Sequence, residues 1–89
     1  MAWKIELAAD ARKELAALDR PIAERIRRFL RERLAPLDDP RSIGEALRGE
    51  RLGNFWKYQV GDWRIIASIE DDAVRILVLR IGNRRAVYR

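Results

Sequence analysis

The spacing of apolar residues changes twice along this chain, and the order of the changes restricts the fold more than any other feature. Trp3, Ile5 and Leu7 alternate with charged residues, which is typical of a strand. Apolar residues then recur at helical spacing and predict helices over residues 9–18 and 19–34. Alternation returns in three runs, at residues 55–60, 63–69 and 73–81, separated by turns at Gly61-Asp62 and Asp71-Asp72.

This order of one strand, two helices and three strands predicts an α+β domain. We expect an antiparallel sheet with the helical pair packed on one face, in the order β-α-α-β-β-β. Ala35-Pro36 and Asp39-Pro40 end the second helix, so residues 37–51 are interpreted as a connection with a short turn around residues 43–47. A chain of 89 residues has room for one core, which makes residues 1–89 a single domain.

The chain contains no cysteine and no histidine. This excludes disulfides, thiolate metal sites, zinc fingers and Ser-His-Asp triads, so we expect neither a metal ion nor a cofactor. An enzyme built from this chain must use carboxylates, Lys, Arg or Tyr. Nineteen basic residues against fourteen acidic ones give a net charge of +5, which favours a polyanionic partner such as nucleic acid, an anionic membrane or an acidic protein. No apolar run approaches the roughly 20 residues of a membrane span, and we expect a cytoplasmic protein.

The turn at Gly61-Asp62 sets the pairing of the first two strands of the meander. A two-residue turn pairs Val60 with Trp63, Tyr58 with Ile65 and Trp56 with Ala67, and these residues should face the helices. The opposite face then carries Gln59 beside Arg64 and places Lys57 diagonally next to Arg64. Two cations are therefore expected together on the face away from the helices.

A similar two-residue turn at Asp71-Asp72 extends this arrangement to the last strand. It places Val74, Ile76 and Val78 in the core, and Arg75, Leu77 and Leu79 on the opposite face. That face becomes basic and partly apolar, since Phe55 and Ile66 also lie on it, and such a surface usually has a partner. The alternatives are a slipped register, or a connection (residues 37–51) that folds over this face.

The chain closes with Gly82-Asn83-Arg84-Arg85-Ala86-Val87-Tyr88-Arg89. On its own this segment is interpreted as a basic tail that binds phosphate through charge. Together with Leu47-Arg48-Gly49 and the run from Trp56 to Ile66, it resembles the RelE family of toxins, within the RelE/ParE superfamily. The resemblance covers the whole chain. It implies a microbial type II toxin that cuts mRNA on the translating ribosome and forms a hetero-oligomer with an acidic antitoxin that neutralises it.

The resemblance also implies roles for individual residues. Four match the family's basic and tyrosine active-site positions: Lys57, Arg64, Arg84 and Tyr88. We expect three further residues to contact RNA, namely Gln59, Arg75 and Arg85. The antitoxin is expected to cover the apolar residues of the open face, namely Phe55, Ile66, Leu77 and Leu79. The chain departs from the family at Gln59, where many relatives are basic, and at Asn83, where many have His.

Metal-free RNA cleavage needs a base for the 2′-hydroxyl, cations for the developing negative charge and an acid for the leaving 5′-oxygen. Free tyrosine has a pKa of about 10, so Tyr88 is a base only if nearby cations stabilise its phenolate. The identity of the acid stays open. ParE-type relatives share the fold but poison DNA gyrase, and they generally lack the complete closing Arg and Tyr pattern. A ParE-like gyrase inhibitor without nuclease activity and a plain basic nucleic-acid-binding module remain the alternatives.

Overall fold

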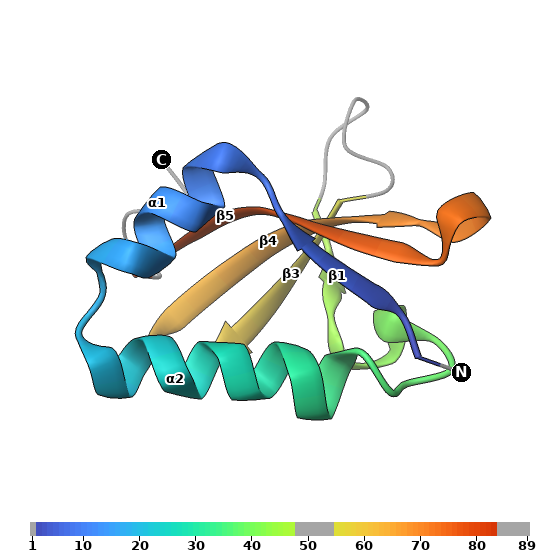
Figure 1. Ribbon diagram of the computed structural model, residues 1–89. Helices are drawn as coiled ribbons and strands as arrows, with labels where there is room; N and C mark the ends of the chain where they lie inside the picture. The colour runs from blue at the N-terminus through green and yellow to red at the C-terminus, as the bar shows by residue number, and fades with distance from the viewer. Residues whose placement is uncertain (1, 48–54, 84–89) are drawn as a thin grey trace.

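The computed structural model describes residues 2–47 and 55–83, which form a five-stranded sheet with helices packed on one face (Figure 1). The first half of the chain contains one strand and the helices: β1 (Lys4–Leu7), α1 (Ala9–Ala17), α2 (Arg20–Arg28) and the π-helical η1 (Phe29–Leu34). The second half contains two 3₁₀ turns and four strands: η2 (Pro40–Ile43), β2 (Glu45–Ala46), β3 (Phe55–Val60), β4 (Trp63–Glu70), η3 (Asp71–Ala73) and β5 (Arg75–Asn83). The α+β class and the predicted order of elements are confirmed.

The sheet has the strand order β1-β5-β4-β3-β2 and is mixed. Strands β2 to β5 are antiparallel to their neighbours, but β1 runs parallel to β5, with Lys4 opposite Arg75 and Leu7 opposite Val78. The prediction of a purely antiparallel sheet was therefore wrong for this one pair. Parallel neighbours need a long crossover, which the helices and the intervening strands provide. The predicted connection also contains β2, whose two residues are too few to show an alternating pattern.

The β3–β4 hairpin has the predicted register. Val60 lies opposite Trp63 and Tyr58 opposite Ile65, and Gly61 takes the left-handed conformation that the tight turn requires (φ 62°). The core combines residues from the helices and from one face of the sheet. Its buried members are Ala11, Leu15, Ala23, Ile26, Leu30, Leu34, Tyr58, Val60, Ile65, Ala67, Ile76, Val78 and Ile81.

The β4–β5 connection differs from the predicted two-residue turn. η3 forms one 3₁₀ turn that ends at Ala73, and the following Val74 has a φ of 49°, so the register is two residues away from the prediction. Ala67 consequently lies opposite Val78. A shift of two preserves the faces, so Ile76 and Val78 are buried as predicted, but Val74 is half-buried outside the strand rather than in the core. A bulge between Ile66 and Ala67 then interrupts the pairing.

Helix α1 lies against the part of β5 that β1 does not reach. β1 ends at Leu7, opposite Val78, so the following residues of β5 have no strand on that side. The Glu14 carboxylate accepts a hydrogen bond from the Ile81 N–H (2.8 Å) and three from Arg80, the shortest from Nη2 (2.9 Å). Burial alone would raise the pKa of Glu14, but the hydrogen bonds from Arg80 and Ile81 outweigh it, and the pKa is lowered. The Glu14 carboxylate thus binds a backbone N–H on the part of the β5 edge that β1 does not cover.

The connection between η1 and β2 is fastened to the core side of β3. The Tyr58 hydroxyl donates a hydrogen bond to the Pro40 carbonyl (2.8 Å), and Arg41 makes a two-pronged ion pair with Asp71 (2.6 and 3.2 Å). Tyr58 faces the helices, so η2 contacts that side of the sheet. This arrangement counts against the alternative that the connection, up to residue 47, covers the opposite face. Within the two described ranges, no helix is long and apolar enough to cross a membrane.

Candidate functional site

Lys57 and Arg64 lie on the face of the sheet opposite the helices, as the register predicts. Lys57 is opposite Ile66 and Gln59 is opposite Arg64, so the two cations are diagonal neighbours. Diagonal positions on adjacent strands are roughly 7 to 8 Å apart, a separation that side chains of this length bridge easily. Two positive charges therefore lie close together on this face, near the β3–β4 turn.

The Arg64 guanidinium is set into the surface. Its Nε and Nη1 atoms are inaccessible to solvent, although the residue as a whole is only half-buried. A guanidinium held in this way has a defined orientation. Because Nε and Nη1 are closed to solvent, Arg64 supplies positive charge to this face, and a two-pronged contact with a phosphate would require its side chain to move.

Glu45 is a site residue that the sequence analysis missed. β2 pairs Glu45 with Lys57, and the Glu45 Oε2 atom lies 3.8 Å from Lys57 Nζ. The side chain of Glu45 is 78% exposed and that of Lys57 is 27% exposed, so the carboxylate reaches out into solvent beside a more enclosed amine. A carboxylate can accept a proton. The site thus has a possible base in a chain without histidine.

Gln59 and Arg75 differ in how they relate to this site. Gln59 is beside Arg64, and its Nε2 donates to the Gly61 carbonyl (3.0 Å). Arg75 lies opposite Glu70, six residues along β4 from Arg64, which corresponds to about 20 Å. It binds Glu70 (2.6 Å from Nε) and Glu6 (3.2 Å from Nη1), and hydrogen bonding to Glu70 raises its pKa. The structure does not bring Arg75 to the site, and its compensated charge argues against binding phosphate.

The apolar residues of this face form a narrower surface than the sequence suggested. Phe55 lies opposite Ser68, and Ser68 lies opposite Leu77, so Phe55 and Leu77 flank one serine in a row across the sheet. Ile66 is only 8% exposed. The pairing leaves Leu79 inside the bulge, because Ala67 pairs with Val78 and Ile66 with Arg80. Phe55 and Leu77 therefore remain as a half-buried pair in one row of this face, and Leu79 is also half-buried.

Residues 84–89 of the closing motif, with Arg84, Arg85 and Tyr88, lie outside the described residues. The first two residues of the motif belong to β5 and are described. Gly82 in β5 lies opposite Arg64, and Asn83 lies opposite Trp63. The described chain thus ends on the strand beside Arg64.

Comparison with known proteins identifies the family of this chain. Residues 5–88 match the family described as the ParE toxin of type II toxin-antitoxin systems, parDE. The chain belongs to the ParE toxin family. The match covers all of the sequence except residues 1–4 and residue 89.

Two relatives of this toxin carry RelE-type names. It is 29% identical to Toxin RelE of Mycobacterium tuberculosis over 98% of this chain and 87% of that protein. It is 27% identical to Toxin RelG of the same organism over 100% of this chain and 99% of that protein. The toxin–antitoxin complex RelBE2 of M. tuberculosis contains a chain with the same fold, with a TM-score of 0.83 at 24% identity over 94% of this chain and 93% of that one. The resemblance to RelE-type toxins is confirmed.

Proposed function

We propose that this toxin is an endoribonuclease that cuts mRNA on the ribosome without a metal ion. The observation that carries the proposal is the pair of Lys57 and Arg64 on the open face, with Gly82 opposite Arg64 at the start of the closing motif. Arg64 would bind the phosphate oxygens, and Lys57 would add positive charge beside it. Arg84 and Tyr88 complete the proposed site through the resemblance to the RelE family.

The proposed reaction is an attack within the RNA strand. A base removes the proton of the 2′-hydroxyl, the 2′-oxygen forms a bond to the adjacent phosphorus, and the bond from phosphorus to the 5′-oxygen breaks. An acid returns a proton to that oxygen, which yields a 2′,3′-cyclic phosphate and a 5′-hydroxyl. Lys57, Arg64 and Arg84 would stabilise the negative charge on the phosphorus oxygens. Tyr88 is the proposed base, and Glu45 beside Lys57 is the described alternative.

The proposed partners follow from this role. The substrate is mRNA presented by the ribosome, since a site without histidine depends strongly on positioning. The neutralising partner is an acidic antitoxin that binds over Phe55 and Leu77, close to Ile66 and Leu79. The family description as a toxin–antitoxin system supports such a partner. Charge attraction to a chain of net charge +5 would speed the encounter, and apolar burial would slow dissociation.

Arg64→Ala in a translation extract tests the proposal directly. The parent should stop protein synthesis and leave mRNA cut, whereas Arg64→Ala should lose about 10²-fold to 10³-fold in cleavage rate, as removal of one charge-stabilising donor usually does. Arg20→Ala is the matched control, because it removes the same charge from an exposed position at the start of α2. Equal cleavage by the parent and Arg64→Ala at matched concentration would show that the site is misplaced.

A second comparison assigns the base. Tyr88→Phe removes only the ionisable hydroxyl, and Glu45→Gln removes only the negative charge. Single-turnover cleavage of mRNA on programmed ribosomes at saturating toxin should be nearly abolished by Tyr88→Phe and reduced less than tenfold by Glu45→Gln. The reverse pattern would transfer the role of base to Glu45.

Gyrase inhibition is the second candidate function, because the matched family is described as ParE. A gyrase inhibitor would block supercoiling by purified gyrase and leave mRNA intact in the extract. The nuclease would do the opposite. A plain nucleic-acid-binding module would neither cut mRNA nor inhibit gyrase, so the two assays together separate the three functions.

A further inference from the structure

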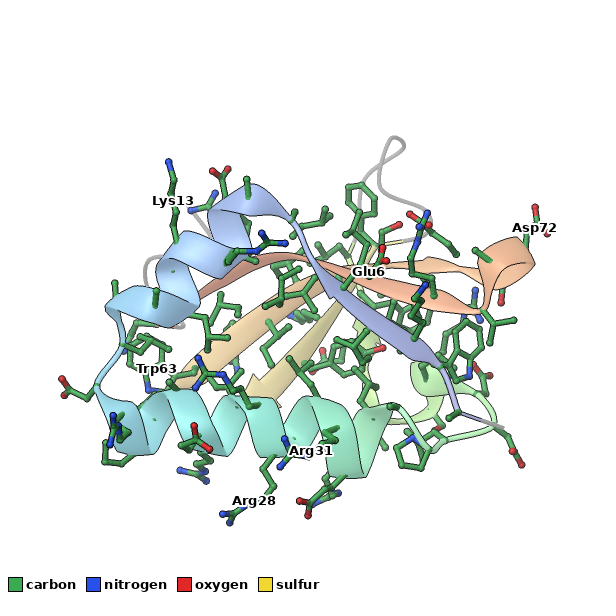
Figure 2. The ribbon with its side chains drawn as sticks, in the orientation of Figure 1. Glu6, Lys13, Arg28, Arg31, Trp63 and Asp72 are labelled. Carbon is green, nitrogen blue, oxygen red and sulfur yellow. The ribbon has the colours of Figure 1, made fainter. Side chains whose placement is uncertain are left out.

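The described arginines differ in their contacts. Within residues 2–47 and 55–83, five arginines bind carboxylates: Arg27, Arg31, Arg41, Arg75 and Arg80. Four others in α2 and η1 are exposed and have no carboxylate partner in that described part of the chain: Arg20, Arg25, Arg28 and Arg33. Arg28 extends from α2 into solvent (Figure 2). Exposed arginines without an acidic partner keep their full charge for a ligand.

Three of these four, Arg25, Arg28 and Arg33, line one groove. Its other walls are Phe29 and Glu32 from the helix and Gln59, Val60 and Gly61 from the β3–β4 hairpin. Arg25 lies directly over the turn, since a Cβ atom on Gly61 would be 2.9 Å from Arg25 Nη1. The groove is thus formed between the helix and the end of β3.

The groove follows an uncovered part of the sheet edge. β2 pairs only with Trp56 and Lys57, so among the described residues no strand lies beside the last three residues of β3 on that side. Gln59 belongs to both surfaces, because it lines the groove and lies opposite Arg64. The positive charge of α2 therefore continues around the edge of β3 to Arg64 and Lys57.

We propose that this groove, lined by Arg25, Arg28 and Arg33, binds the sugar–phosphate backbone of RNA. The inference deepens the proposed function and rests on it, since the bound strand would continue along α2 from the active site. Guanidinium groups match phosphate oxygens, and several on one helix suit a repeating anion. Stable binding of an acidic polypeptide requires apolar anchors. The groove offers only Phe29 and Val60, both of which pack in the core, and Glu32 pairs with Arg31 (3.5 Å).

Two triple variants with equal loss of charge test the groove. The groove variant is R25Q/R28Q/R33Q, and the control variant R20Q/R27Q/R31Q removes three charges from other positions on the same two helical segments. The probe is a 2′-O-methyl oligouridylate, which cannot be cleaved because it lacks the 2′-hydroxyl nucleophile. Binding is measured as a function of salt concentration. Each lost phosphate contact should lower the slope of log affinity against log salt by about 0.7, so the groove variant should lose about 2 and the control less than 0.7.

Three results would overturn the groove assignment: equal losses in the two variants, no loss in either, or an equal loss of binding to polyglutamate, which would indicate an unspecific anion site. Thermal unfolding of each variant shows whether it folds. If a triple variant does not fold, the single changes Arg28→Gln and Arg31→Gln provide the same comparison with an expected slope difference of about 0.7.

Cleavage in the translation extract separates the groove proposal from the proposed endoribonuclease function. If the parent cuts mRNA but the groove and control variants bind RNA equally well, the groove proposal alone is refuted. If the parent neither binds RNA nor cuts mRNA, the groove proposal and the proposed endoribonuclease function are both refuted.

Discussion

Removing the hydroxyl of Tyr58 tests how the connection that carries Glu45 is held. Tyr58 is 1% exposed, and its hydroxyl donates to the carbonyl of Pro40, which is also fully buried. Tyr58→Phe keeps the ring and its contact with Phe29, whose centroid is 6.0 Å away, and removes only the donor. The Pro40 carbonyl is then left without this hydrogen bond in a buried position.

The expected loss is about 1 to 2 kcal/mol of unfolding free energy, because a buried acceptor without its partner costs about 1 to 3 kcal/mol. For a domain of this size, each kcal/mol lowers the melting temperature by about 4 to 8 °C. We therefore expect Tyr58→Phe to melt about 5 to 15 °C below the parent near neutral pH. Urea unfolding should show a lower midpoint with an unchanged slope, since the core keeps its extent.

The pH dependence provides a second, independent test of the same bond. Burial raises the pKa of Tyr58 to about 12, against about 10 for free tyrosine. Above about pH 10 the unfolded chain releases this proton while the folded protein retains it, so stability falls as pH rises toward the folded value. At about pH 11 the parent should lose about 1.4 kcal/mol that the Phe variant does not lose. The gap between the two proteins should therefore shrink steadily above about pH 9.

Urea unfolding of both proteins between neutral pH and about pH 11 measures this gap, and groups that titrate in both cancel from the difference. Parallel stability curves over that range would show that the Tyr58 hydroxyl is solvated rather than buried. A variant as stable as the parent at neutral pH would show that the Pro40 carbonyl has another donor. Either result would refute the account of how the connection is fastened.

Three further variants test other parts of the structure. Gly44→Ala would place a Cβ atom 2.7 Å from the Tyr58 ring, so it should lower stability by about 1 to 3 kcal/mol in urea unfolding. Glu14→Gln weakens the acceptor of the Ile81 N–H. The lowered pKa of Glu14 means that its contribution is present near neutral pH and is lost in acid, so the two stability curves should converge as pH falls below about 4.3. Arg75→Ala should change mRNA cleavage in the translation extract less than tenfold, because its charge is already compensated.

Local patterns predicted the parts of the fold that depend on near neighbours. A two-residue turn fixes a register, so Gly61 and Asp62 were sufficient to place Lys57 diagonally to Arg64. The second turn contains Asp71 and Asp72 and resembles the first in sequence, but a 3₁₀ turn and a left-handed Val74 replace the tight hairpin. Nothing in the alternation of a strand reveals a shift of two residues, because such a shift leaves every side chain on the same face.

Contacts between distant residues account for what the sequence did not show. Glu45 reaches Lys57 only because Tyr58 and Arg41 fasten η2 so that β2 follows beside β3. A two-residue strand has no period, and a lone carboxylate in a connection carries no sign of its partner. The parallel placement of β1 beside β5 is similar, since it depends on where the helices return the chain.

The distribution of charge connects the fold with the proposed function. A net charge of +5 could be spread evenly over the surface. In the described ranges, however, carboxylates compensate the arginines that join one element to another. Arg41 of η2 pairs with Asp71 of η3, and Arg80 of β5 pairs with Glu14 of α1. The groove arginines without carboxylate partners lie along the free edge of β3, next to the face that holds Arg64. A polyanion is therefore attracted to one side of the molecule. That attraction acts before any contact forms, so raising the salt concentration should slow association with ribosomes more than it slows cleavage of mRNA already bound.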